Sequence, residues 1–382
     1  MSVPPAVSPF VPGRGGLPPY LAGRDNEQDA LKRLLAYLEH GRGAPRDVIV
    51  VGPRGNGKTV LLRWFQREIE AGETKIDAVW LTPSDIRSLD GLATELVPPR
   101  RFASLRPESF SFSVGIGRLG WELGNRPASL TRLLAARCRQ RALVVLLDEA
   151  HDLDKDVANL LLNASQSVAA DAPILLVLAG TPGLQAHLNT ISATFWNRAR
   201  QIGVSRLDAE ATAAALMRPL AVQSPAIAFE DAALAKVVAE SQGYPYFVQL
   251  WGDALWHAAN DTAETRIGDA LVTTARRSFD RERTDYYEDR RYELEQRGLA
   301  GVSVSVAAAF RESATLTGRA LKSAIAAALP DGSCANALQF QEALASVGYV
   351  WRSPGAGNLW EPGIPSLMSY IEATERQADW KA

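Results

Sequence analysis

Residues 47–63 read DVIVVGPRGNGKTVLLR. The first five are rich in β-branched side chains, which is typical of a buried parallel strand. They lead directly into G-x-x-x-x-G-K-T, after which apolar residues recur at helical spacing as far as Ile69. Strand, glycine-rich loop and helix follow one another in the order that phosphate binding requires. We therefore predict that this stretch is the centre of an α/β domain and that its loop binds phosphate.

The residue types of the loop indicate how it would hold an anion. Its glycines allow the backbone to curl so that successive N–H groups point at the anion, and the following helix N-terminus adds positive partial charge. Lys58 is expected to reach the β- and γ-phosphates of ATP, and the Thr59 hydroxyl to bind Mg²⁺. A glycine-rich turn without a ligand is the alternative, but the flanking strand and helix argue against it. The predicted nucleotide-binding residues are Gly52, Pro53, Arg54, Gly55, Asn56, Gly57, Lys58, Thr59 and Val60.

The composition limits the class of protein. A length of 382 residues suggests two or three domains, and a hydrophobic fraction of 47% is enough for a substantial core. The net charge of −2 argues against a strong overall basic field. The two cysteines, Cys138 and Cys334, lack metal-ligand spacing and fit a reducing cytoplasm. The sequence shows neither a signal peptide nor an apolar run long enough to span a membrane, so we expect a cytoplasmic protein without a membrane partner.

A second motif, ALVVLLDEAH, occupies residues 142–151. Its apolar run predicts a buried strand that ends at Asp148, the position near Mg²⁺ in open α/β folds. Glu149 is then placed to polarise an attacking water, which makes it the predicted catalytic carboxylate. An ordinary acidic strand end is the alternative, and the glycine-rich loop upstream argues against it. The DEAH spelling also matches a helicase box, but nothing else in the chain supports a helicase core.

Further apolar runs complete the predicted sheet. Strands are expected at 78–83, 173–180 and 201–207, which gives five strands with intervening helices in a doubly wound α/β domain. The glycine-punctuated alternation at 110–124 predicts an inserted β-hairpin, to which we assign no chemistry. Residues 1–19 are rich in proline and glycine and are expected to form an extended or disordered arm.

The second half of the chain is mainly helical by its periodicity. Residues 208–263 predict a small helical bundle, and the balanced charges of 264–299 predict a solvated connecting helix. Three short helices and a strand–turn–strand at 348–360 predict a winged helix over 300–373, with a tail at 374–382. The 300–373 segment is not basic, so duplex DNA and a protein remain alternative partners for it.

Taken together, these features resemble the bacterial and archaeal AAA+ and STAND ATPases that are related to origin-recognition-type initiators. The resemblance covers roughly residues 20–371. It rests on the order of Gly23-Arg24-x-x-Glu27, the loop, Asp148-Glu149, Gly243-Tyr244-Pro245 and the strand–turn–strand. It implies an ATPase domain at 20–207, a helical lid at 208–263, and Mg²⁺-dependent ATP hydrolysis that switches conformation or assembly.

The same resemblance implies roles for single residues. Arg24 would lie near the adenine, and Thr181 would touch the γ-phosphate or the water. Pro245 would stand where other AAA+ proteins carry the sensor 2 arginine, and this sequence has no arginine beside it. The positive charge would then come from Arg198 or Arg200, with Arg206 as a further candidate, acting in trans on a neighbouring subunit. Self-association is therefore expected.

Three functions remain compatible with the sequence. The first is an ATPase that acts as a switch on a partner. The second is a DNA-binding initiator or loader that uses the winged helix, and the third is a scaffold held by a nucleotide with negligible turnover. Metabolite kinases also use such a loop, but they rarely carry a helical lid followed by a wing.

Overall fold

The computed structural model describes residues 7–13, 15–72, 75–96, 127–329, 334–352 and 357–379. The β-hairpin expected at 110–124 lies outside these residues. The chain divides into two compact units. We name them the sheet unit, which comprises Glu27–Val51 and Leu61–Ile202, and the helical unit, which comprises Met1–Asn26, Gly52–Val60 and Gly203–Ala382. The glycine loop, residues 52–59, therefore belongs by its contacts to the helical unit.

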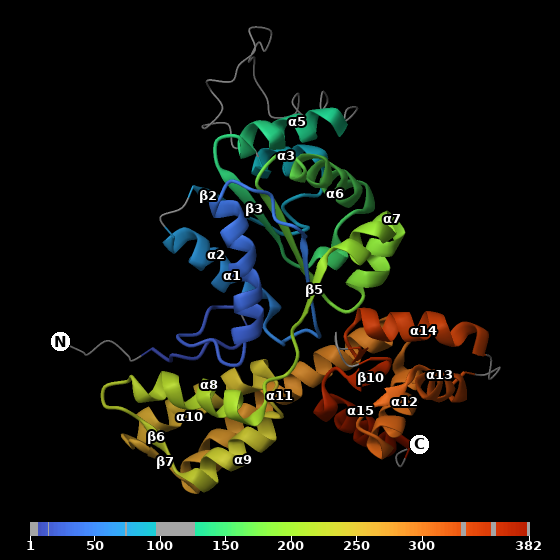
Figure 1. The fold of residues 1–382 in the computed structure, drawn as a ribbon. Coiled ribbons are helices and arrows are strands. Elements are labelled where there is room, and N and C mark those ends of the chain that lie inside the picture. The colour runs from blue at the N-terminus through green and yellow to red at the C-terminus, as the bar shows by residue number, and fades with distance from the viewer. Residues whose placement is uncertain are drawn as a thin grey trace. The chain divides into compact units, whose positions relative to one another are not determined.

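A five-stranded sheet forms the centre of the sheet unit (Figure 1). Its spatial order is β2-β3-β4-β1-β5, and β1 pairs with β4, β4 with β3, and β3 with β2, all in parallel. β1, β3 and β4 are buried along their whole length, which explains why each reads as an unbroken apolar run. The α/β prediction is confirmed. The strands are β1 (Val48–Val51), β2 (Ile76–Leu81), β3 (Ala142–Leu147), β4 (Ile174–Gly180) and β5 (Arg200–Gly203).

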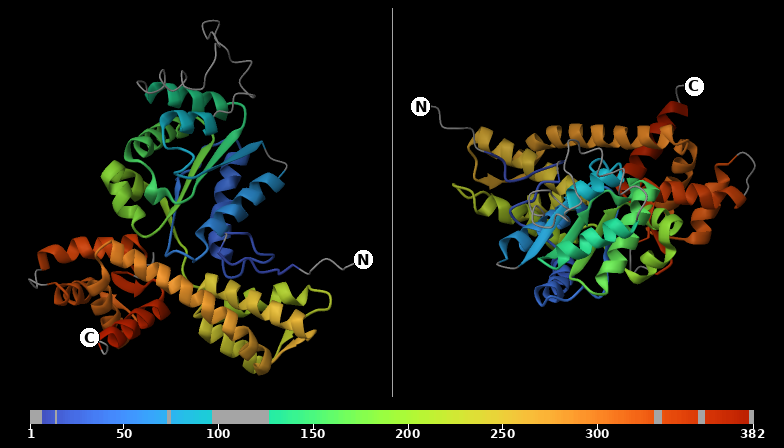
Figure 2. Two further views of the ribbon diagram at one scale, coloured as in Figure 1. Left: turned by 180° about the vertical axis from the view of Figure 1, so that it is seen from behind. Right: turned by 90° about the horizontal axis from the view of Figure 1, so that it is seen from above.

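Helices cover both faces of this sheet. The views in Figures 1 and 2 place α1 and α2 on one face and α5, α6 and α7 on the other. α1 buries Leu31, Leu34, Leu35 and Leu38, the apolar face that its spacing predicts. The helices are α1 (Asp25–Glu39), α2 (Lys58–Ala71), α3 (Leu89–Leu96), α5 (Pro127–Cys138), α6 (Lys155–Ala169) and α7 (Leu184–Arg198).

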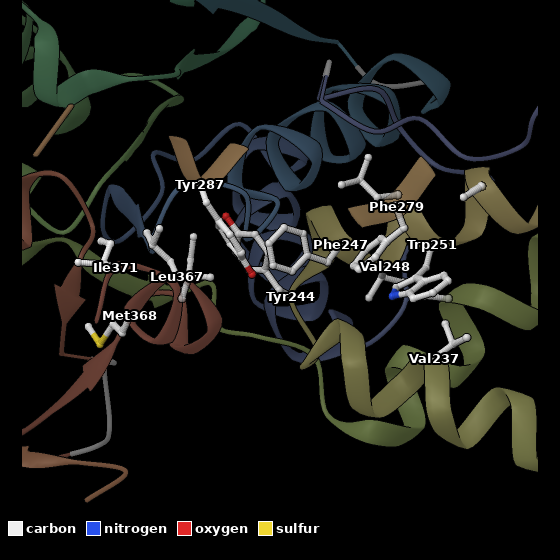
Figure 3. Packing of buried hydrophobic residues seen from close by; sticks show 14 of the residues in the cluster. Val237, Tyr244, Phe247, Val248, Trp251, Phe279, Tyr287, Leu367, Met368 and Ile371 are labelled. Carbon is white, nitrogen blue, oxygen red and sulfur yellow. The ribbon is translucent and has the colours of Figure 1, made fainter. Parts of the chain in front are cut away.

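The first part of the helical unit is a bundle with an aromatic core. Trp251 of α10 stacks on Phe279 of α11 with ring centroids 4.2 Å apart, and Phe247 meets Tyr244 edge to face at 4.7 Å (Figure 3). The charged stretch expected to connect two domains is one 28-residue helix, α11. The elements are α8 (Ala209–Ala221), β6 (Ala228–Phe229), α9 (Asp231–Ser241), α10 (Pro245–Thr262), β7 (Arg266–Ile267) and α11 (Asp269–Gln296).

The C-terminal region, residues 300–379, adds four helices and a small sheet to the helical unit within its described ranges, 300–329, 334–352 and 357–379. β10 lies between β8 and β9 and is antiparallel to both. Tyr349 is buried, and its hydroxyl donates a 2.8 Å hydrogen bond to the backbone oxygen of Ser303 on the first helix of the region. The elements are α12 (Ala300–Glu312), β8 (Leu316–Thr317), α13 (Gly318–Ala327), α14 (Cys334–Ser346), β9 (Val350–Trp351), β10 (Leu359–Pro362) and α15 (Pro365–Asp379).

The N-terminal arm differs from its expectation over residues 7–13 and 15–19. Phe10 is buried, and a Cβ added to Gly252 of α10 would lie 2.3 Å from its ring. The backbone N–H of Val11 donates a 3.0 Å hydrogen bond to the side chain of Gln249. This part of the arm is packed rather than free, because one aromatic side chain finds a site on α10 that a proline- and glycine-rich composition does not reveal.

Candidate functional site

The glycine loop of the helical unit surrounds the ammonium group of Lys58. Lys58 is only 5% exposed, and its Nζ donates hydrogen bonds of 2.9 Å to the backbone oxygens of Gly52 and Pro53. Gly55 and Gly57 have φ of +79° and +92°, a backbone conformation that side chains rarely allow, so both positions favour glycine. The loop thus holds a buried cation next to its own carbonyl groups.

Arg24 and Asn56 fasten this loop to the segment after β5. The Nη2 of Arg24 donates to the backbone oxygens of Asn56 at 3.1 Å and Ser205 at 2.6 Å, and the guanidinium is almost fully buried. The Nδ2 of Asn56 donates to the backbone oxygen of Val204 at 2.9 Å. Arg24 therefore bonds to the loop backbone, and its predicted contact with an adenine stays a prediction.

The side chain of Tyr244, the residue that immediately precedes α10, contacts the glycine loop. Its side chain is 1% exposed, and its hydroxyl donates a hydrogen bond to the backbone oxygen of Arg54. A Cβ at Gly55 would lie 2.0 Å from this hydroxyl, so no other residue fits at that position. Burial raises the pKa of Tyr244 well above its usual value, which keeps the phenol protonated and able to donate.

Sequence reasoning did not find Tyr244. The prediction for Gly243-Tyr244-Pro245 concerned the proline, and Pro245 is the first residue of α10. The tyrosine between them carries the observed contact instead. A tyrosine between a glycine and a proline was the available signal, but the sequence does not show its acceptor, the Arg54 carbonyl.

The side chain of Arg54 connects the same loop to α11. Its Nη1 lies 3.4 Å from Oε2 of Glu293, which also pairs with Arg290 at 2.7 Å. The Tyr244 hydroxyl meets the Tyr286 hydroxyl, also on α11, at 2.9 Å. The loop is thus in contact with both α10 and α11 through its backbone and one side chain.

The sheet unit brings a second group of predicted residues to the carboxyl ends of two adjacent strands. Asp148 follows β3 and is buried, and its Oδ1 accepts the backbone N–H of Glu149 at 3.0 Å. Glu149 has φ 51° and ψ 34°, a left-handed conformation that is uncommon for residues other than glycine and is often found at functional sites. Its carboxylate is half-exposed.

Thr181 and His151 complete this second group. Thr181 follows β4 and is fully buried, and its hydroxyl has no hydrogen-bond partner among the residues that the structure describes. The Nδ1 of His151 lies 3.4 Å from the backbone nitrogen of Thr181 and 3.4 Å from Oε2 of Glu149. His151 was not predicted as a site residue, although it is the last letter of the DEAH spelling.

The predicted finger arginines lie outside these groups. Arg198 ends α7, Arg200 begins β5, and Arg206 follows in the helical unit. All three are exposed, and none forms an ion pair within the described ranges. Their role in trans stays a prediction.

No group of three or more His, Cys, Asp or Glu side chains suited to a metal occurs in the described part of the chain. Within the same part, every helix is too short or too polar to cross a membrane.

Comparisons with known proteins agree with the fold. Residues 20–177 match the family model of the AAA ATPase domain. Among solved structures, the Aeropyrum pernix ORC2 protein in its ADPNP–ADP complexes is similar with a TM-score of 0.61 at 14% identity, covering 97% of this chain and 98% of that chain. The ADP form of the same protein gives 0.58 at 14% identity, covering 95% and 97%. No curated protein matches this chain in sequence.

Proposed function

We propose that this chain, which contains an AAA ATPase domain at residues 20–177 and is folded like archaeal ORC2, binds Mg-ATP and hydrolyses it as a switch that acts on a partner. The observation that carries the proposal is the glycine loop with its buried Lys58 ammonium. A cation held against two backbone carbonyls at the N-terminus of a helix is well suited to an anionic ligand.

In this proposal the loop binds the phosphates. The N–H groups around Gly55 and Gly57 contact them, and Lys58 exchanges its bonds to the Gly52 and Pro53 oxygens for bonds to phosphate oxygens. The exchange is favourable because a charge-assisted bond to phosphate is stronger than one to a neutral carbonyl. ADP and ADPNP in the similar ORC2 structure support a nucleotide as the ligand.

We assign the Mg²⁺ ligands to Thr59 and Asp148. A hydroxyl and a carboxylate are the oxygen ligands that Mg²⁺ prefers, and Asp148 is a buried acid at a strand end. When bound, the ion would neutralise charge on the phosphates. We combine the two residues because β1, β3 and β4 of the sheet unit are parallel. The loop follows the carboxyl end of β1, and Asp148 follows the carboxyl end of β3.

Hydrolysis would depend on Glu149. Its half-exposed carboxylate can accept a hydrogen bond from a water, and His151 lies beside it. The buried Thr181 hydroxyl, without a partner in the described residues, is available to a phosphate oxygen or to the same water. We assign Arg198 or Arg200 to charge compensation in trans, so the active form would contain at least two copies of the chain.

The switch would begin at the contacts between the loop and the two long helices of the helical unit. Phosphate binding that moves the loop backbone alters the bond from Tyr244 to the Arg54 oxygen and the Arg54–Glu293 pair. α11 also contacts the C-terminal region, where the Tyr370 hydroxyl donates a hydrogen bond to Glu288. Loop occupancy can thus affect residues 300–379.

We infer that the C-terminal region is a winged helix, because helix, strand, two helices, two strands and a final helix follow in that order. The helix in the recognition position, α14, has no lysine or arginine and leaves Leu338 47% exposed. A helix without cations cannot form charge-assisted contacts to phosphates, whereas an exposed leucine suits a protein surface. A protein partner is therefore favoured over duplex reading by α14.

The test of nucleotide binding is Lys58→Ala. We expect tight ATP binding to be lost in a calorimetric titration of the folded variant, with Lys32→Ala as the control because Lys32 is exposed and pairs with Glu68. Unchanged affinity in Lys58→Ala would refute the proposal. Glu149→Gln should bind ATP and turn it over poorly, and wild-type turnover in this variant would remove Glu149 from the catalytic role.

Two further measurements separate the alternative functions. A wild-type protein that binds ATP but releases no phosphate over hours would be a scaffold rather than a switch. Retention of the protein on duplex DNA, decreasing steeply with salt, would favour the initiator or loader function.

A further inference from the structure

A pocket of about 610 Å³ lies in the C-terminal region, away from the glycine loop in sequence. It is formed by α13, one residue of α14, one residue of β10 and the residues that follow β9 and precede β10. Its volume is in the range of pockets for small ligands. Its lining includes Arg319, Lys322, Gln341, Arg352, Asn358 and Trp360.

The charge of this pocket is unusual for its surroundings. Residues 300–373 contain four cations, and three of them, Arg319, Lys322 and Arg352, line the pocket. The fourth, Arg311, pairs with Glu372. Among the residues that the structure describes, the lining contains no carboxylate and none of the three cations forms an ion pair. Three like charges that share one cavity repel one another unless an anion compensates them.

The backbone adds to this positive potential. The ten-residue helix α13 begins at Gly318, and Arg319 lies in its first turn. The Thr317 hydroxyl caps the helix by accepting the N–H of Ala320 at 3.2 Å, which leaves the N–H groups of the first two helical residues without an intrahelical partner. An anion at this end of the pocket would meet these groups as well as the Arg319 and Lys322 side chains.

An aromatic ring and a buried amide give the pocket a second kind of recognition. The guanidinium of Arg352 lies 5.7 Å from the ring centroid of Trp360, and its Nη1 is 3.5 Å from Oδ1 of Asn358. Gln341 is 8% exposed, and its Oε1 has no hydrogen-bond partner among the described residues. A buried acceptor without a donor is costly, which points to a ligand that brings an N–H group.

We propose that this pocket binds a nucleotide unit, with the phosphate at Arg319 and Lys322, the planar base at Trp360 and Arg352, and a base N–H group on Gln341. Arginine suits phosphate, an indole face stacks on bases, and an amide oxygen selects an exocyclic amine. The unit can be a free mononucleotide or one residue of a single strand, which share this chemistry. The site is separate from the glycine loop and does not rest on ATP hydrolysis.

The experiment measures binding of AMP, inorganic phosphate and a short single-stranded adenine oligonucleotide by equilibrium dialysis. The full chain is used as wild type and as Lys58→Ala, so that binding at the glycine loop is removed. We expect AMP to bind both forms equally, and Arg319→Gln with Lys322→Gln to weaken it at least tenfold. Arg311→Gln is the matched control, because Arg311 is the cation of residues 300–373 that does not line the pocket.

Gln341→Met separates recognition from folding. It replaces a buried amide, whose oxygen has no partner among the described residues, by an apolar side chain of similar length, so thermal stability should stay equal or rise. AMP affinity should fall several-fold while phosphate affinity is unchanged. A parallel loss of stability and of both affinities would contradict the assignment of Gln341.

The probes also distinguish the source of the nucleotide. If AMP binds and the oligonucleotide binds no more tightly than AMP, the ligand is a free nucleotide. If the affinity increases with oligonucleotide length, the ligand is a single strand of nucleic acid. The proposal is overturned if neither AMP nor the oligonucleotide binds to Lys58→Ala, or if binding persists in the Arg319→Gln, Lys322→Gln double variant.

Discussion

The Nδ1 atom of His151 lies 3.4 Å from Oε2 of Glu149. The same nitrogen faces the backbone N–H of Thr181, and a ring nitrogen that accepts this N–H is unprotonated. His151 therefore connects the strand end that carries the acidic pair to the strand end that carries Thr181. In the proposed ATPase it acts as a positioning residue for Thr181, because an unprotonated Nδ1 accepts the Thr181 N–H and has no proton to donate to the Glu149 carboxylate.

We expect His151→Ala to lower turnover about tenfold, a loss of about 1.4 kcal/mol in transition-state stabilisation, with ATP affinity nearly unchanged. His151→Asn should recover part of the rate, because its amide can present an acceptor close to the position of Nδ1. Steady-state phosphate release and an ATP titration measure the two effects. His257→Ala, on α10 and half-exposed, is the control. Equal rates for the Ala and Asn variants would mean that the bond to Thr181 does not matter.

Tyr244→Phe should destabilise the protein and weaken nucleotide binding. The change leaves the Arg54 oxygen and the Tyr286 hydroxyl without their buried partner, at a cost of about 1–3 kcal/mol in the free energy of unfolding. Because the Arg54 oxygen is part of the glycine loop, ATP affinity should fall about fivefold. Denaturant unfolding and calorimetry measure these effects, with Tyr292→Phe on exposed α11 surface as control. An unchanged affinity would show that Tyr244 only supports the fold.

The exposed arginines test assembly. Arg198→Ala or Arg200→Ala should lower turnover by at least tenfold and leave ATP affinity nearly intact, since a finger contacts the γ-phosphate of a neighbouring copy. Mixing either variant with Glu149→Gln should restore part of the activity, because some interfaces then combine an intact arginine with an intact Glu149. Turnover per subunit that does not depend on protein concentration, together with no recovery on mixing, would show a monomer.

Asp47 makes the stability of the sheet unit depend on pH. Burial raises the pKa of its carboxyl from 3.8 to about 6, although its Oδ1 accepts the N–H of Leu176 at 2.9 Å. The folded state then holds its proton more tightly than the unfolded state. Asp47 therefore destabilises the fold progressively as pH rises from about 4 to 6, by about 1–3 kcal/mol in total.

Asp47→Asn keeps the acceptor and removes the titration. The difference in unfolding free energy between variant and wild type should be small at pH 4 and should grow in favour of the variant up to pH 7. Chemical denaturation at these pH values measures it, and Asp171→Asn, at an exposed position, should show no such trend. A constant difference across this pH range would contradict the assignment.

The sequence was most informative where chemistry is contained in a short segment. The apolar run before Asp148 predicted β3, because burial follows from the side chains of the segment itself. The strand expected at 78–83 spans Ile76–Leu81, so it begins two residues earlier and ends two residues earlier than expected. Arg198 and Arg200 as fingers, the metal ligands and the adenine contact of Arg24 remain predictions.

Other features depend on pairs that are far apart in sequence. Tyr244 meets a carbonyl 190 residues away, and a backbone oxygen has no side-chain signature. The pocket of the C-terminal region was not predicted from the sequence for a similar reason. Its three cations were too few to make residues 300–373 basic, and only the fold of α13 with β9 and β10 brings them together.

The place of the glycine loop in the helical unit has a consequence for shortening the chain. A fragment that ends at residue 207, where the ATPase domain was expected to end, would retain G-x-x-x-x-G-K-T in full. It would lose Tyr244, Tyr286 and Glu293, the side chains that hold the Arg54 carbonyl and guanidinium. The fragment would then contain the sequence motif but would lack the side chains that hold the loop backbone in a single conformation.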